Sequence, residues 1–115
     1  MTGDFENIYY IDTVTDYYLR FYSGPNLELE ISAGGDSFFA EREKLLKDVC
    51  IEDTERLKEA LSKENLQKYL SSEEDLSLLF NMKIGDKIVP HRLQTVRTRN
   101  NDRQHIVVGI RQETE

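Results

Sequence analysis

The sequence has few of the residues that form covalent or metal-bound frameworks. It contains one cysteine, Cys50, in 115 residues, so no intramolecular disulfide can form and no cysteine-rich metal cluster is available. It also has no apolar run near the roughly 20 residues that span a bilayer. Residues 1–6 are acidic rather than basic, and no apolar stretch follows them, unlike a secretory signal. We therefore expect no membrane insertion and a cytoplasmic location.

Positive charge is scarce as well. Lys and Arg total 15 against 22 Asp and Glu, which gives a formal net charge of -7. Proteins that bind nucleic acids or anionic lipid rely on Lys and Arg to contact phosphates. We therefore expect no nucleic-acid partner. The hydrophobic fraction of 38% predicts instead one globular domain over residues 1–115.

Alternating apolar residues predict strands at both ends of the chain. The first part holds two short segments rich in aromatic and β-branched residues, which predict a hairpin within about 8–23, before a Gly-Pro break. Alternation returns at Leu76 and predicts three further strands within about 75–112. Pro90 falls in the second of these, where we expect a sheet edge or a bulge, because proline cannot donate to the ladder.

A helical period separates the two groups of strands. Between residues 38 and 49 the apolar side chains recur at spacings of three and four, which predicts an amphipathic helix. Asp36 or Ser37 can cap this helix by accepting a bond from an unpaired backbone N–H. Asp53 is expected to cap a second helix, which a shorter third one follows.

This order predicts an α+β fold with a five-stranded antiparallel sheet and short helices, over about 37–70, packed on one face. The opening hairpin should pair with the closing strands, because two strands alone are marginally stable in water.

Several short motifs follow one another in the order found in a known family. Residues 35–39 read Gly-Asp-Ser-Phe-Phe, similar to a Gly-x-x-Phe-Phe motif. Residues 49–56 resemble Val-His-Pro-Glu-Asp-x-x-Arg, with Cys-Ile in place of His-Pro, and residues 107–110 resemble a last strand. Together these resemble the PAS fold, particularly bacterial PAS domains upstream of diguanylate cyclase (GGDEF) domains and sensor kinases. At the C-terminal end, only Thr114 matches the family's Asp-Ile-Thr.

The resemblance implies a non-enzymatic, signal-sensing regulatory domain. Such a domain binds a small ligand between helices and sheet, or pairs with another copy through the outer sheet face. It would control a downstream output domain in the parent chain, such as a diguanylate cyclase or histidine kinase. Six residues are candidates for the interior lining, although they can equally be packed core: Phe39, Leu46, Leu61, Leu78, Phe80 and Val108.

Both faces of the predicted sheet are apolar. One face must meet the helices, and the other then leaves a patch that a monomer would rarely expose. We therefore expect a homodimer or a domain of a larger chain, with ordinary cross-strand tyrosines in solvent as the alternative. The expected contact face consists of Tyr9, Ile11, Tyr18, Tyr22, Leu79 and Val89.

Cofactor-binding residues are not evident. Cys50 precedes the acidic Glu52 and Asp53 instead of a base or cation, and no flavin-adduct motif surrounds it, so we expect a structural thiol. His91 and His105, the two histidines, fall roughly 23 Å apart on adjacent strands and cannot share a metal. We expect both to be polar surface residues, with no haem ligation.

Carboxylates give no clear acid–base pair. Asp12, Asp16, Glu28 and Glu30 lack the apolar surroundings that would separate their pKa values, so we interpret them as solvated turn residues. Two alternatives stay open. A small enzyme with a ketosteroid-isomerase-like cavity would need an inward-facing carboxylate or histidine, and none is evident. A ligand-free dimerisation module would differ from a sensor only in lacking a cavity.

Overall fold

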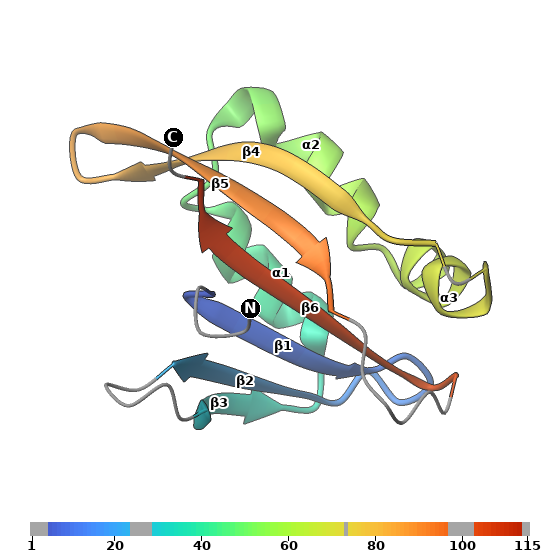
Figure 1. The fold of residues 1–115 in the computed structure, drawn as a ribbon. Helices are drawn as coiled ribbons and strands as arrows, with labels where there is room; N and C mark the ends of the chain where they lie inside the picture. Colours follow the sequence, from blue (N-terminus) through green and yellow to red (C-terminus); the bar gives the residue numbers. More distant parts are fainter. Residues whose placement is uncertain (1–4, 24–28, 73, 97–102, 114–115) are drawn as a thin grey trace.

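A computed structural model describes residues 5–23, 29–72, 74–96 and 103–113 (Figure 1). These residues form one six-stranded antiparallel sheet and three helices. The strands are β1 (Asn7–Asp12), β2 (Tyr18–Ser23), β3 (Leu29–Gly35), β4 (Ser77–Ile84), β5 (Lys87–Thr95) and β6 (His105–Gln112), and the helices are α1 (Phe38–Leu46), α2 (Ile51–Ala60) and α3 (Lys63–Ser72).

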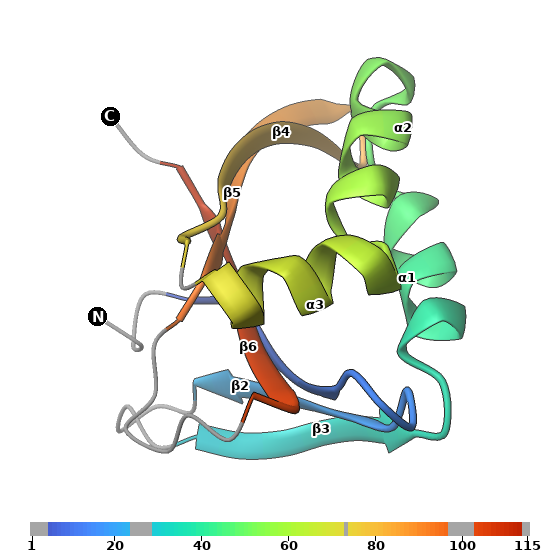
Figure 2. The ribbon, with the colours of Figure 1, turned by 90° about the vertical axis from the view of Figure 1, so that its right-hand side faces the viewer.

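The α+β class is as predicted, and the opening hairpin pairs with the closing strands. The strand order is β3-β2-β1-β6-β5-β4, so β1 and β6 lie together at the centre. Their register runs from Asn7 opposite Ile110 to Asp12 opposite His105. The helices form one layer on one side of the sheet (Figure 2). We call the sheet face toward the helices the inner face and the opposite one the outer face.

The expected number of five strands is wrong, because β3 adds a sixth at the edge beside β2. Residues 29–33 alternate apolar and polar side chains, but they are followed by Gly34-Gly35, a pair that is typical of loops. Instead, both glycines continue the strand opposite Leu19 and Tyr18. A Cβ on Gly34 would lie 3.0 Å from Leu19 Cδ2, so the close approach of β2 leaves little room for a side chain. The predicted break at residues 24–26 lies outside the described residues.

Helix boundaries follow local capping. Ser37 is the N-cap of α1, and its side chain accepts a bond from the Ala40 amide, as predicted. The helix ends before Val49, which instead forms a single bridge with Met82 of β4. The prediction that Asp53 caps α2 is wrong: the helix begins at Ile51, and the Asp53 side chain is used elsewhere.

The expected sheet edge or bulge at Pro90 is not found: β5 is an internal strand with a regular register, and Pro90 lies just before its ladder with β6 begins. It pairs with Asn81 of β4, but the β5–β6 register begins only at His91 opposite Gln112. Its carbonyl accepts a bond from the Glu113 amide just beyond β6. The proline therefore removes no donor from a regular β5–β6 pair.

One hydrophobic core fills the space between the inner face and the helices. Phe38 of α1 is at its centre, 1% exposed, with its ring 5.6 Å from that of Tyr9 and 6.2 Å from that of Tyr18. Such edge-to-face contacts fix the helix against the sheet. The described buried core residues are Tyr9, Ile11, Tyr18, Phe38, Leu46, Val49, Leu57, Leu61, Leu66, Leu76, Phe80, Leu93, Ile106, Val108 and Ile110.

Candidate functional site

A buried polar cluster lies where α1 meets β1 and β2. Glu41 of α1 is only 6% exposed, and its Oε2 accepts a bond from Arg20 Nη1 at 2.7 Å. Arg20 Nε also donates to Ser32 Oγ of β3 at 3.0 Å. The cluster therefore ties the first helix to the edge of the sheet through a charge-assisted bond that is largely removed from water.

Two tyrosines complete this cluster. Burial, followed by the negative charge of Glu41, raises the pKa of Tyr9 to about 12, against the opposing effect of Arg20. Burial and a hydrogen bond to Glu41 likewise raise the pKa of Tyr18. Both phenols therefore stay neutral over the physiological range, and the Tyr18 hydroxyl donates a hydrogen bond to the Glu41 carboxylate.

Sequence reasoning missed this inward-facing carboxylate. A signal was present, since Glu41 lies three residues after Phe38 and four before Leu45, on the same helical face. An acidic residue within an apolar stripe requires a partner when it is buried, and Arg20 supplies it.

The six candidates for the interior lining do lie in the interior. Leu46, Leu61, Phe80 and Val108 belong to the buried core, while Phe39 and Leu78 are partly buried against it. Their packing agrees with the core interpretation, and a ligand among them stays a prediction.

The expected contact face is largely wrong. Tyr9, Ile11 and Tyr18 are 3%, 1% and 7% exposed and lie on the inner face, in contact with the helices. Alternation separated the two sets of side chains correctly along β1 and β2, but it cannot say which set the helices cover. Leu79, in contrast, lies opposite Arg92 on the other face from Tyr9 and Ile11. Of the remaining three, Tyr22 and Leu79 are exposed, and Val89 is half-buried opposite Met82.

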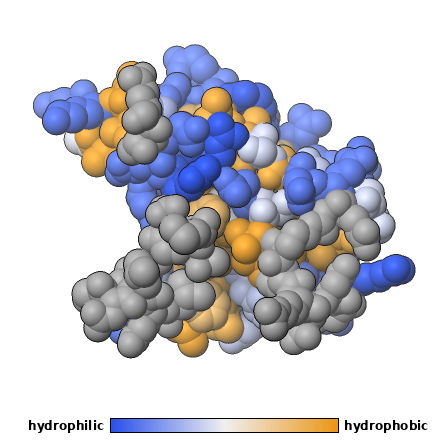
Figure 3. Space-filling model, in the orientation of Figure 1, coloured by the Kyte–Doolittle hydropathy of each residue, from blue (hydrophilic) through white to orange (hydrophobic). Residues whose placement is uncertain are grey.

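The outer face carries the other set of apolar side chains. Tyr10 lies opposite Leu19 on one side and Val107 on the other, and Phe21 lies opposite Ile31. Tyr10 is 37% exposed and Ile31 63%. Hydrophobic surface is visible in the lower half of the outer face, over β1–β3, and again at the tip of the β4–β5 hairpin, with hydrophilic surface between them (Figure 3). We call these five residues the outer patch.

The histidines differ from expectation. His91 is 0% exposed rather than a surface residue. Its Nδ1 lies 2.9 Å from the Val89 carbonyl oxygen, and its Nε2 lies 3.1 Å from Glu6 Oε1. His105 is partly exposed on the outer face, where its ring stacks on Tyr10 at 4.7 Å.

The carboxylates of the β1–β2 turn stabilise that turn. Asp12 is partly desolvated, but bonds from the Gln104 side chain and the Val14 and Thr15 amides hold its pKa well below its usual range. Asp16 has a φ of 72° and contacts Lys63 of α3 at 3.1 Å. These roles are structural rather than those of solvated side chains.

The next candidate carboxylate, that of Glu30, also has a hydrogen-bond partner. Glu30 is the acceptor for the Tyr22 hydroxyl, whereas Glu28 falls outside the described residues. In the part of the chain that the structure describes, no group of three or more His, Cys, Asp or Glu side chains is placed to hold a metal ion.

The segment of residues 49–56 fastens α2 to the edge strand β4. Asp53 is 8% exposed; its Oδ2 accepts a bond from the Asn81 amide at 2.8 Å, and its Oδ1 lies 2.6 Å from Arg56 Nη2. Arg56 also donates to the Leu79 carbonyl at 2.9 Å. Cys50 is 2% exposed, and its amide donates to the Asn81 carbonyl. This segment therefore covers the backbone of β4, which an edge strand would otherwise present to other chains.

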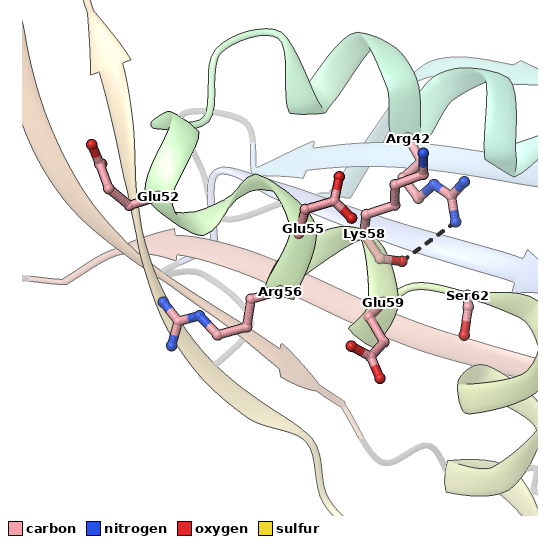
Figure 4. A pocket seen from close by; sticks show the side chains of 7 residues that line it. All are labelled: Arg42, Glu52, Glu55, Arg56, Lys58, Glu59 and Ser62. Carbon is pink, nitrogen blue, oxygen red and sulfur yellow. Dashed lines mark hydrogen bonds between the residues drawn. The ribbon is translucent and has the colours of Figure 1, made fainter.

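Two open depressions flank Arg56. The first is lined by Arg42, Glu52, Glu55, Arg56, Lys58, Glu59 and Ser62 (Figure 4). Arg42 Nη1 lies 3.5 Å from the Lys58 carbonyl and 3.4 Å from that of Leu61, so the guanidinium caps the C-terminal end of α2. The second depression lies at the β4 edge, and its lining is Asp53, Arg56, Leu79, Phe80, Asn81, Pro90 and Glu113.

Neither depression presents a set of convergent catalytic groups. In the first, the charged side chains of α2 point in different directions along the helix (Figure 4). In the second, Asp53 is bonded to Arg56, and Glu113 is bonded to Arg92. The charges of the second depression are thus already paired.

The chain matches no protein-family model, no curated protein and no solved structure. Among the described residues, no helix has the length and apolar character needed to cross a membrane. What the chain does must therefore be inferred from its fold and its own residues.

Proposed function

We propose that the chain is a PAS-type regulatory module of the cytoplasm, without catalysis of its own, that pairs with a second copy through the outer face of its sheet. Pairing would transmit a signal to an effector such as a diguanylate cyclase or a histidine kinase. A small ligand between helices and sheet would act by favouring one of two conformations.

The observation that carries this proposal is the outer patch. All three helices pack on the inner face, so they leave Tyr10, Leu19, Phe21, Ile31 and Val107 without a covering layer of helices. Monomeric proteins rarely expose a contiguous apolar patch, and such a patch commonly marks an interaction site. Arg92 and Arg111 lie opposite each other on β5 and β6, and Arg92 is bonded to Glu113, so the outer face is not uniformly acidic despite the net charge of -7.

The layout and one motif support the family assignment within this proposal. Two strands, three helices and three strands follow in the order of the resemblance, with β3 as an addition. The Asp and Arg of residues 49–56 are bonded to each other and to β4. This gives a physical reason why that motif would accompany such a fold.

A small-molecule-processing enzyme is the second candidate, because Glu41 is an inward-facing carboxylate. However, Glu41 is paired with Arg20 and bonded by Tyr18. A general base needs a free lone pair aimed at a substrate, so the cluster favours a structural or ligand-positioning role over catalysis.

Sedimentation equilibrium of the chain and of Ile31→Lys tests the pairing. Lysine at this exposed position of the outer patch should weaken self-association about tenfold or more, since a buried charge without a partner is costly. Ile51→Lys is the matched control, because Ile51 is 81% exposed on α2, on the other side of the molecule. A monomeric parent chain, or equal weakening by both variants, would contradict pairing through the outer patch.

Native mass spectrometry with an absorbance scan tests the ligand. Extra mass that disappears on denaturation would reveal a bound molecule and its chemical class. Bare, colourless protein would leave pairing as the function.

A further inference from the structure

A short segment before β1 lies on the outer face. The Gly109 position of β6 faces outward, because its neighbours Val108 and Ile110 are both in the core. A Cβ at Gly109 would lie 2.5 Å from Phe5 Cδ1, so the Phe5 ring rests directly on this glycine. Phe5 is 6% exposed and Ile8, opposite Gly109, is 4% exposed. Phe5 therefore covers Gly109 on the outer face, whereas the Glu6 side chain reaches His91, which lies beside the core residue Phe80 on the inner face. We call Phe5 and Glu6 together the strap.

Glu6 holds this strap in place by two contacts. Its amide donates to the Ile110 carbonyl at 2.8 Å. Its Oε1 lies 3.1 Å from Nε2 of the buried His91. The other ring nitrogen lies 2.9 Å from the Val89 carbonyl oxygen, so the imidazole is held between two oxygen atoms. His91 is anchored in β5 and therefore serves as a fixed attachment point.

We infer that this strap is an autoinhibitory contact, which must lift from Gly109 before a second copy can bind along β1 and β6. The inference rests on the proposed pairing through the outer face. With the strap closed, Phe5 occupies the surface over Gly109 and shields Ile8, next to Tyr10 and Val107 of the outer patch. Lifting it exposes Ile8 and the flat surface of the glycine, which enlarges the apolar area available to a partner.

Two variants open the strap by different means. Gly109→Ala places a methyl group where the Phe5 ring lies and displaces it. Glu6→Ala removes the carboxylate from His91 while keeping the backbone. Glu55→Ala is the matched control, because Glu55 is an exposed glutamate on α2. Amide hydrogen exchange at residue 6, measured by NMR on the chain with Phe5 intact, reports strap opening.

Sedimentation equilibrium on the same samples reports self-association. We expect exchange at residue 6 to be about tenfold faster in both strap variants, because a local opening exposes its bond to Ile110. We also expect dimers about tenfold tighter than those of the parent chain, and no change in Glu55→Ala.

The two readouts separate the possible failures. Unchanged exchange in both variants would show that these contacts do not hold the strap, and would overturn the inference. Faster exchange with unchanged or weaker dimers would also overturn it, while the proposed pairing would stand. If the strap opens and no variant associates at any concentration, the proposed pairing itself fails, and the inhibitory role fails with it.

Discussion

At the scale of single residues, the buried ionisable side chains decide how the elements are joined. Glu41 and His91 are almost fully buried, yet each contacts a charged partner at the surface, Arg20 and Glu6 respectively. Removing one partner of such a pair leaves a desolvated group unpaired, at a cost larger than the pair's own contribution. Each pair therefore fixes one element: α1 against β2, and the strap against β5.

Tyr9 should make the free energy of unfolding decrease with pH in the alkaline range. Its pKa is raised from 10.0 to about 12, by burial and then by Glu41. The folded chain thus keeps the proton that the unfolded chain releases. The stabilisation is complete below pH 10 and is lost as pH rises toward 12. Two pKa units correspond to roughly 3 kcal/mol.

Urea unfolding at pH 9 and pH 11.5 measures this loss. Tyr9→Phe should remove most of the difference between the two pH values, whereas Tyr17→Phe, at an exposed position, should keep it. An equal pH dependence in the chain and in Tyr9→Phe would rule out Tyr9 as its source.

At the scale of elements, the sequence pattern determined the type of most segments but not their faces. Period-two and period-three-to-four spacings predicted five of the six strands and all three helices. They could not choose between Tyr9 and Tyr10 for the core, because both sets along β1 are apolar and the choice depends on where Phe38 packs. β3 was not predicted, because its two glycines are typical of a turn. In the structure, Gly34 and Gly35 instead allow β3 to pack closely against β2.

Polar contacts between distant elements were even less accessible. Asp53 was predicted to cap a helix, but its partner, the Asn81 amide, lies 28 residues away. The Glu6–His91 contact joins residues 85 apart. Local patterns carry no information on such pairs, since only the tertiary arrangement brings them together.

The Asp53 bonds should be essential for attaching α2 to β4. Asp53→Ala would leave the Asn81 amide and Arg56 without their carboxylate, at a cost of about 1–3 kcal/mol. Glu52→Ala, at the exposed neighbouring position, should change stability by less than about 0.5 kcal/mol. Urea unfolding at neutral pH measures both. Similar stabilities for the two variants would show that this attachment contributes little.

At the scale of the whole molecule, the two central strands of the sheet come from opposite ends of the described chain. β1 and β6 are central neighbours, with Ile8 opposite Gly109 and Ile11 opposite Ile106. Such pairs form only after a long loop has closed, and closure of long loops slows folding. The surface proposed for pairing is thus assembled only in the complete fold, so an incompletely folded chain would not present it.

Native-state hydrogen exchange should show this arrangement as a gradient of protection across the sheet. Ladder amides shared by β1 and β6, such as those near Ile11 and Val108, should exchange only through global unfolding, because strands cover them on both sides. Amides of β3 should exchange through local opening, since this edge strand has one strand neighbour, and Ile31 is 63% exposed. Low concentrations of urea should therefore accelerate amide exchange in β1 and β6 as steeply as they promote global unfolding. The same urea should hardly change the exchange rates of the β3 amides. If the amides of β3 were instead as protected as those of β1, the free edge of β3 would have to be covered in solution. A second copy that pairs along this edge would then explain self-association better than contact through the outer patch.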